Sequence, residues 1–193
     1  ALAALGRDPG DLGKALRQQQ FGGLAVGQQC TVHLAKPGQQ PGVLVPERRA
    51  ERTTEGGLDA AGQHNSLAPI VARLKAAGIR VSLFIAPEKA QLDAAAQLGA
   101  PVVELHTGPY AHAEGDAVAI ELMRLQAAAT YGASLGLEIH AGHGLTVDNV
   151  GPVAAIPELA ELNIGHFLIG EAVFSGLPAA IAEMRARMDA ARA

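Results

Sequence analysis

The chain has 193 residues, of which 15 are basic and 19 are acidic, so its formal net charge is −4. Hydrophobic residues make up 49% of the chain, which excludes a wholly disordered protein. The chain has no block of Lys or Arg and is only 3% aromatic, which argues against nucleic acid or an anionic membrane as partner. Cys30 is the single cysteine, so no intrachain disulfide can form, and this favours a cytoplasmic protein.

Residues 1–42 differ in composition from the rest of the chain. Glutamine and turn-forming residues are frequent in this stretch, and its hydrophobic periodicity is weak. We expect at most a short helix over 11–17 and a short strand over 30–34. Residues 43–193 are expected to form the main structural unit.

Strand and helix patterns alternate from Val43 onward. Such alternation predicts parallel strands joined by crossover helices, either in a (β/α) barrel or in an open doubly wound sheet. Five strands are fewer than an eight-stranded barrel requires. The expected strands cover 43–45, 80–85, 101–107, 137–140 and 161–164, and the expected helices cover 66–77, 87–98, 116–135, 147–155, 167–174 and 178–191. Ser66 is the expected N-cap of the first helix, while Gly78 and Gly99 are expected to end the first two.

Polar side chains follow the predicted strands. In parallel α/β folds, ligands bind beyond the carboxyl ends of the strands, so these loops are the candidate site. The loops are 46–57, which contains Thr53, then 104–108, 140–144 and 163–166. Thr53 and its neighbouring glycines can hold a phosphate or sugar hydroxyls, or can form a solvated turn.

The last two of these loops predict a phosphate site. Gly142 and Gly144 flank His143 and allow a ligand to approach the backbone, and Gly165 and His166 stand at the start of a short helix, whose free N–H groups attract anions. The alternative is that these glycines only form tight turns. Between two glycines at a strand end, His143 is a candidate general acid or base rather than a core residue.

Glu104 and His106 are two residues apart on a strand and therefore face the same side. A carboxylate in a packed sheet interior is costly unless it binds something, so Glu104 is a candidate catalytic residue, with a buried ion pair as the alternative. A metal site at His140 and His143 is less favoured, because neither HExxH spacing nor a third clear ligand is present. His64 and His112 are expected to be solvated.

Five segments, in order and with matching spacing, resemble the pyridoxine 5′-phosphate synthase family. They are LVPERRAERTTEGGLD (44–59), VSLFI (81–85), ELHTG (104–108), AGHGL (141–145) and IPELAELNIGHFLIGEAVFSGL (156–177). The resemblance covers residues 43–193. It implies a TIM-type (β/α)8 barrel, of which about five βα units are recognisable here, and an octamer built from dimers.

The resemblance also implies an activity. The family condenses 3-amino-2-oxopropyl phosphate with 1-deoxy-D-xylulose 5-phosphate to give pyridoxine 5′-phosphate, phosphate and water, without an organic cofactor or a metal. By analogy, His143 is the proton donor and Glu104 stabilises charge in the transition state. Gly144, Gly165 and His166 would hold the amino-ketone phosphate, and Thr53 would contact the deoxyxylulose phosphate.

Residues 1–42 depart from the family's opening strands. Thr31–Leu34 echoes its second motif, but Ala35 and Lys36 replace the Arg-Glu that should follow. We therefore expect a truncated or misread gene start, or a variant that closes its sheet differently or with a partner chain. The unpaired sheet edges of an incomplete barrel predict poor solubility or obligate association. Two other functions stay open: a phosphate-binding barrel aldolase or isomerase, and a non-enzymatic remnant or assembly partner that retains phosphate binding only.

Overall fold

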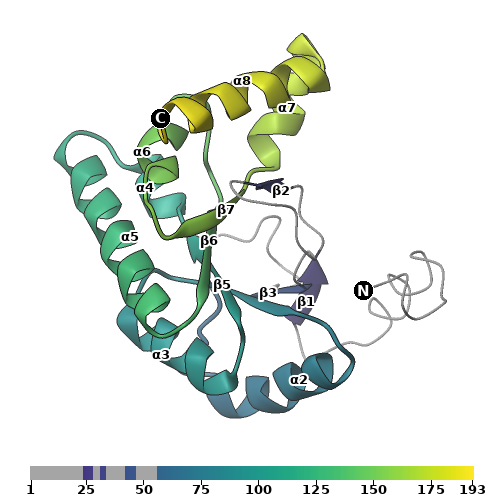
Figure 1. The fold of residues 1–193 in the computed structure, drawn as a ribbon. Helices are drawn as coiled ribbons and strands as arrows, with labels where there is room; N and C mark the ends of the chain where they lie inside the picture. Colours follow the sequence, from purple (N-terminus) through teal and green to yellow (C-terminus); the bar gives the residue numbers. More distant parts are fainter. Residues whose placement is uncertain (1–23, 28–30, 34–41, 47–55) are drawn as a thin grey trace.

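A computed structural model describes residues 24–27, 31–33, 42–46 and 56–193. Its strands form one seven-stranded sheet in the order β1-β3-β4-β5-β6-β7-β2 (Figure 1). Strands β3 to β7 pair in parallel and in chain order, which confirms the predicted α/β class. Their bounds are β3 Gly42–Pro46, β4 Val81–Ile85, β5 Val102–His106, β6 Glu138–Gly142 and β7 Leu159–Asn163.

Two short strands flank the parallel set. β1 (Leu24–Gly27) pairs antiparallel with β3, and β2 (Thr31–His33) pairs antiparallel with β7. The expected strand over 30–34 is therefore confirmed. The expectation that the outermost parallel strands lack partners is wrong, because antiparallel hydrogen bonds from a preceding segment satisfy them.

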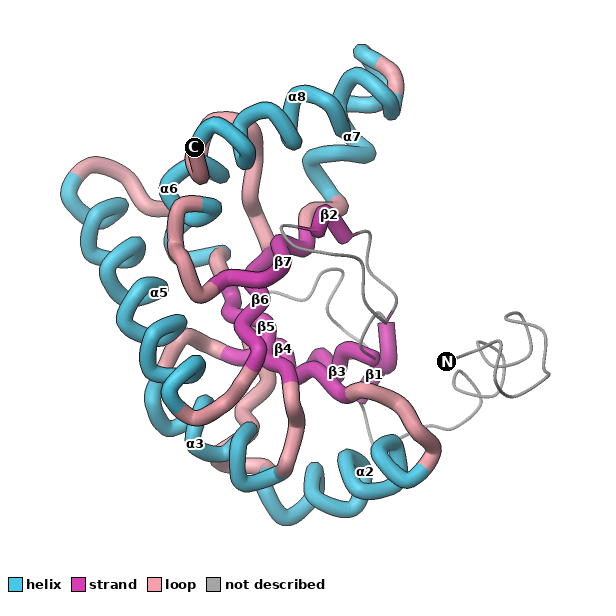
Figure 2. Tube along the Cα trace, in the orientation of Figure 1, coloured by secondary structure: helices cyan, strands magenta, loops and turns pink. Residues whose placement is uncertain are grey.

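The helices lie on the outer side of the curved sheet (Figure 2). The longer ones are α2 His64–Ala76, α3 Lys89–Leu98, α5 Asp116–Ser134, α7 His166–Ser175 and α8 Leu177–Ala190, and the short ones are α4 Gly108–His112 and α6 Val150–Ala154. None of the helices in the described part of the chain is long and apolar enough to cross a membrane.

The expected glycine positions at helix C-termini are found in the structure, whereas the expected serine N-cap is not. Gly99 is the left-handed C-cap of α3, with φ of 71°, and Gly78 after α2 has φ of 74°, as expected of both residues. Ser66, however, is not an N-cap. The helix begins at His64 after Gln63, and no side chain caps it.

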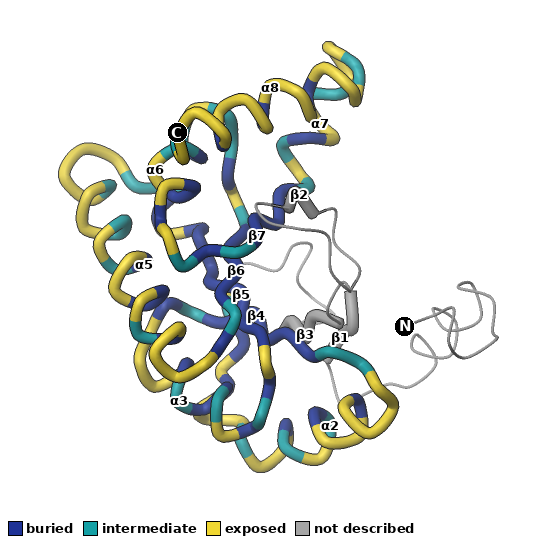
Figure 3. Tube along the Cα trace, in the orientation of Figure 1, coloured by how far each residue is buried: buried dark blue, intermediate teal, exposed yellow. Residues whose placement is uncertain are grey.

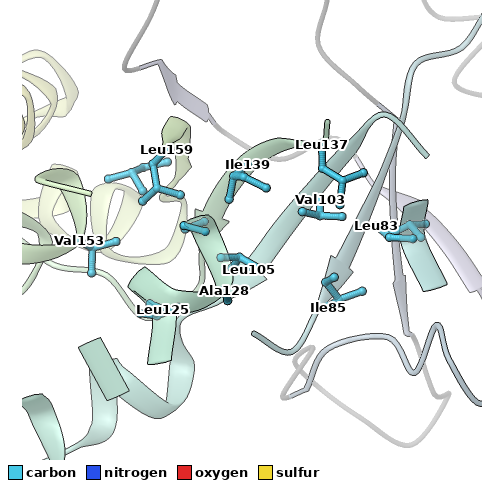
Figure 4. Close-up of a cluster of buried hydrophobic side chains, with 14 of the residues drawn as sticks. Leu83, Ile85, Val103, Leu105, Leu125, Ala128, Leu137, Ile139, Val153 and Leu159 are labelled. Carbon is cyan, nitrogen blue, oxygen red and sulfur yellow. The ribbon is translucent and has the colours of Figure 1, made fainter. Parts of the chain in front are cut away.

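The two faces of the sheet carry different side chains. The outer face packs apolar side chains against the helices (Figure 4), and the described parallel strands β4 to β7 are mostly buried (Figure 3). The inner face carries most of the buried polar side chains of the described residues. The outer set includes Leu83, Ile85, Val103, Leu105, Ile139, Ala141 and Leu162, and the inner set includes Ser82, Glu104, His106, His140, Glu161 and Asn163.

A register shift between β6 and β7 explains why Glu161 and Asn163 lie on the inner face. Ile139 lies opposite Leu159, but His140 lies opposite Glu161, so β7 advances two residues where β6 advances one. The extra residue, Ala160, forms a bulge, which reverses the alternation of faces in β7. Leu159 thus joins the outer apolar cluster, while Glu161 joins the inner face.

Candidate active site

A cavity of about 540 Å³ opens at the carboxyl ends of the parallel strands. Five of the six predicted site residues line it: Glu104, His143, Gly144, Gly165 and His166. The other lining residues are Phe84, His112, Leu145, Thr146, Asn163, Ile164 and Phe167. Thr53 lies outside the described residues. The cavity therefore brings together residues from β4, β5, α4 and the loops that follow β6 and β7, which are distant in the sequence.

An unusual backbone conformation presents His143 at the end of β6. Its φ is 86°, and it is the one non-glycine residue with positive φ in the described part of the chain. Such a conformation costs about 1 kcal/mol or more and persists only where the surroundings fix it. The Thr107 hydroxyl lies 2.6 Å from the carbonyl oxygens of both Gly142 and His143, and the Thr107 N–H donates to the Gly142 carbonyl at 2.8 Å. Thr107 therefore holds this turn.

Two buried rings lie beside the His143 imidazole. The His106 and His143 ring centroids are 4.9 Å apart, and Phe84 packs edge-on against His106 at 5.1 Å. Burial, and secondarily the charge that His143 would carry, lower the pKa of His106 to about 4. His106 is therefore a neutral ring at physiological pH.

Glu104 projects from the middle of β5 into the same cavity with 1% of its surface exposed. A Cβ at Gly142 would lie 2.5 Å from Glu104 Oε1, so the glycine makes room for the carboxyl group. Burial and the nearby negative charge of Glu161 raise the pKa of Glu104 to about 8, against an opposing hydrogen bond with the Asn163 side chain. Glu104 is thus a largely protonated acid at pH 7.

The part of the cavity lining formed by the start of α7 suits an anion. Gly165 is the N-cap of α7 and His166 its first residue, and no side chain caps the helix. The first-turn N–H groups of this ten-residue helix therefore have no partner within the helix, and they carry partial positive charge. A Cβ at Gly165 would meet nothing within 4 Å, so the space beside it is open.

The Gly144 turn completes that part of the lining. Gly144 has φ of 80°, and a Cβ there would lie 2.7 Å from the Ala111 Cβ. Asn149 fixes the following loop, because its Oδ1 accepts a hydrogen bond from the Thr146 N–H at 2.8 Å. The turn requires glycine both for its conformation and for its close packing on α4.

The alternative metal site at His140 is not formed. His140 lies on the inner face with its Nε2 2.8 Å from Glu138 Oε1, whereas His143 lies in the turn beyond the strand. No group of three or more His, Cys, Asp or Glu side chains is arranged to hold a metal ion within residues 56–193.

Sequence reasoning missed three parts of the site. Phe84 and Asn163 line the cavity, although each was treated only as part of a strand or loop. His112 is exposed, as expected, but it also lines the cavity. The signal for Phe84 and Asn163 was available, because each has the strand parity of Glu104 once the register is known.

Comparison with known proteins finds similar sequences over most of the chain, including the residues that line the cavity. The model of the family described as pyridoxal phosphate biosynthesis protein PdxJ matches residues 26–190. The chain is 66% identical over 153 residues to a pyridoxine 5′-phosphate synthase from Jannaschia sp. (strain CCS1), covering 77% of this chain and 62% of the relative. It is 65% identical over 150 residues to the Zymomonas mobilis protein of the same name, covering 78% and 59%.

A protein with that name from Rhodospirillum rubrum is 64% identical over 149 residues, which cover 77% of this chain and 60% of the relative. The chain thus spans about three fifths of the length of the curated relatives that it matches. The family match begins at residue 26, ahead of Val43, where the resemblance found in the sequence begins.

Proposed function

The chain belongs to the family of the pyridoxal phosphate biosynthesis protein PdxJ, a TIM-barrel family, and on this premise we propose that it acts as a pyridoxine 5′-phosphate synthase. The reaction proposed is the condensation of 3-amino-2-oxopropyl phosphate with 1-deoxy-D-xylulose 5-phosphate, which yields pyridoxine 5′-phosphate, inorganic phosphate and water. Both substrates are phosphorylated, and the cavity needs no net positive charge to hold them, because backbone N–H groups supply the binding.

One observation carries the proposal: a single cavity is lined both by two side chains suited to acid–base chemistry and by a helix N-terminus suited to an anion. His143 and Glu104 line this cavity together with the start of α7 at Gly165 and His166. A volume of about 540 Å³ falls within the range of small-molecule sites and has room for a phosphorylated substrate.

In this proposal His143 is the proton donor. Condensing an amine with a ketone expels water, and later steps expel phosphate and further water, so protons must reach departing oxygens at neutral pH. Neutral His106 packs against the His143 ring and orients it without competing for the proton. Glu104 stabilises the charge that develops on the substrate, from the floor of the cavity.

Gly144, Gly165 and His166 would hold the phosphate of the amino-ketone. The N-terminus of α7 stabilises a dianion through N–H groups and the helix dipole, and the Gly144 turn brings more backbone to the same part of the lining. Thr53 is proposed to contact the deoxyxylulose phosphate through its hydroxyl, on the strength of the motif alone.

We also propose a cytoplasmic homo-oligomer, an octamer by resemblance. Large apolar side chains on α7 and α8 support association, because they are 43–89% exposed in the single chain. They are Ile169, Val173, Phe174, Leu177 and Ile181. Sedimentation velocity on the full chain should show an assembly that Phe174→Ser weakens, and a monodisperse monomer would refute this part of the proposal.

Turnover by the purified full chain tests the activity. Both substrates are supplied, and pyridoxine 5′-phosphate and inorganic phosphate are measured separately. His143→Ala should lower kcat about 10²- to 10⁴-fold, the usual contribution of a general acid. His64→Ala is the matched control, since His64 lies on α2 and does not line the cavity.

A binding measurement separates the second candidate, a remnant that binds phosphate only. Calorimetric titration with 3-amino-2-oxopropyl phosphate reports binding whether or not product forms. Binding of this phosphate without product formation from the two substrates would favour the remnant. The absence of both binding and product would reject both functions.

A further inference from the structure

Three ionisable side chains lie in a row across neighbouring strands of the inner face. Glu104 of β5 lies opposite His140 of β6, and His140 lies opposite Glu161 of β7. Their exposed fractions are 1%, 2% and 6%. Burying charged groups costs several kcal/mol each unless they are paired, so this row must share its protons and charges among its members.

The β7 bulge is what creates the row. Simple alternation would place Glu161 on the same face as Leu159, beneath the helices. The extra residue in β7 instead turns Glu161 toward His140 and Glu104. A strand irregularity thus places a second carboxyl group behind the cavity.

The two carboxyl groups of the row lie in different surroundings. Glu161 Oε1 lies 3.5 Å from His140 Nδ1, a contact too long for a strong hydrogen bond. The other ring nitrogen, Nε2, lies 2.8 Å from Glu138 Oε1. Glu104 Oε2, by contrast, is buried with no hydrogen-bond partner among the described residues. A carboxyl oxygen without a partner in a buried site favours the protonated form of Glu104.

The remaining groups around Glu104 do not reverse this assignment. Strand β4 contributes the Ser82 hydroxyl and the Phe84 ring, and β5 contributes the neutral His106. From β6 come His140 and Glu138, and Glu138 is itself paired with Arg80 at 2.6 Å. The described titratable groups that face the inner side near Glu104 are His106, Glu138, His140, His143 and Glu161.

We propose that Glu161, held beside His140, is a positioning residue that keeps Glu104 protonated, so that Glu104 donates a hydrogen bond to a substrate oxygen that becomes negative. A carboxylate would repel such an oxygen, whereas a buried neutral acid stabilises it. This deepens the role proposed above for Glu104, and it rests on the proposed function only for the identity of the substrate. The raised pKa of Glu104 supports it.

The test follows the Glu104 proton directly. The full chain, labelled with ¹³C at the glutamate side-chain carboxyl, is titrated by NMR from pH 4 to pH 10, and Glu104→Gln assigns the Glu104 signal. In the unsubstituted chain we expect Glu104 to titrate with a pKa of about 8. In Glu161→Gln this pKa should fall by about one unit or more, because a neighbouring negative charge is removed.

Two further variants control the result. Glu158→Gln makes the same chemical change just before β7, where Glu158 bonds Thr130 at the surface, and should leave the Glu104 signal unmoved. Glu161→Asp keeps the charge but retracts it by one methylene, so the pKa of Glu104 should fall by less than in Glu161→Gln. If Glu161→Gln does not fold, as judged by its amide spectrum, Glu161→Asp decides in its place.

Glu104 titrating near its ordinary pKa of 4.5 in the unsubstituted chain would overturn the inference. So would a Glu104 pKa that neither Glu161 variant moves. The measurement needs no turnover, so a chain that makes no product still yields a decisive result. If product forms, the alkaline limb of kcat/KM should move to lower pH in Glu161→Gln by the same amount.

Discussion

The outer and inner faces of one sheet obey opposite rules. On the outer face Leu83, Val103 and Ile139 pack against helices, and each gains stability from burial alone. On the inner face Glu104 and His106 are equally buried but have shifted pKa values that disfavour their charged forms. The first face therefore stabilises the fold and the second gives up stability to prepare a reaction site, a division that substitutions on each face can separate.

Leu105→Ala tests the stabilising face and should have the largest effect. Leu105 is 1% exposed and lies near Ala128 of α5 (Figure 4). Its truncation leaves a cavity and should lower the free energy of unfolding by about 2–5 kcal/mol. Urea denaturation measures this loss, while phosphate affinity of the folded fraction should stay unchanged. A loss below about 1 kcal/mol would show that the outer face is not tightly packed.

Glu104→Gln tests the opposite rule and should stabilise the protein at alkaline pH. The folded pKa of about 8 lies above the ordinary 4.5, so the folded state retains a proton that the unfolded chain releases within that window. The free energy of unfolding therefore falls as pH rises from 4.5 to 8. Gln removes this loss, and we expect a gain of about 4 kcal/mol at pH 8 and little change near pH 4.5. Denaturation at both pH values should show that difference, and an equal effect at each would contradict it.

Gly142→Ala should damage the inner face more than the fold. Its Cβ would lie 2.5 Å from Glu104 Oε1 and 2.7 Å from the Asn163 carbonyl oxygen, so the strand ends must move apart. We expect a loss of about 1–3 kcal/mol in unfolding free energy, as for overpacking, with substrate binding weakened at least tenfold. Gly151→Ala is a matched control, because a Cβ there meets nothing within 4 Å. Similar binding in both variants would argue against the geometry at Gly142.

His106→Asn should have the smallest effect on the free energy of unfolding, and this effect should appear below pH 6.5. The folded pKa of about 4 lies below the ordinary 6.5, so the unfolded chain binds a proton that the folded state does not take up between those values. Stability is therefore lost as pH falls from 6.5 toward 4, and Asn should remove about 1–2 kcal/mol of that loss. Thermal unfolding between pH 4 and pH 7 measures it. An unchanged slope would mean that His106 is charged in the fold.

Sequence patterns predicted what depends on local chemistry. Alternating strands and helices, the shared face of Glu104 and His106, and the meeting of the 140–144 and 163–166 loops all follow from period and parallel connection. The inward position of Glu161 does not, because a bulge depends on the pairing partner and leaves no local signal. Strand β1 and helix α4 were also missed, since four or five residues give too short a pattern.

The extra residue in β7 has a consequence for how such a sheet diversifies. Gain or loss of one residue between Leu159 and Glu161 moves the following side chains of the strand from one face of the sheet to the other. The residue types themselves do not change. Insertions and deletions at this point thus offer a route to new chemistry that point substitution reaches only through several costly intermediates.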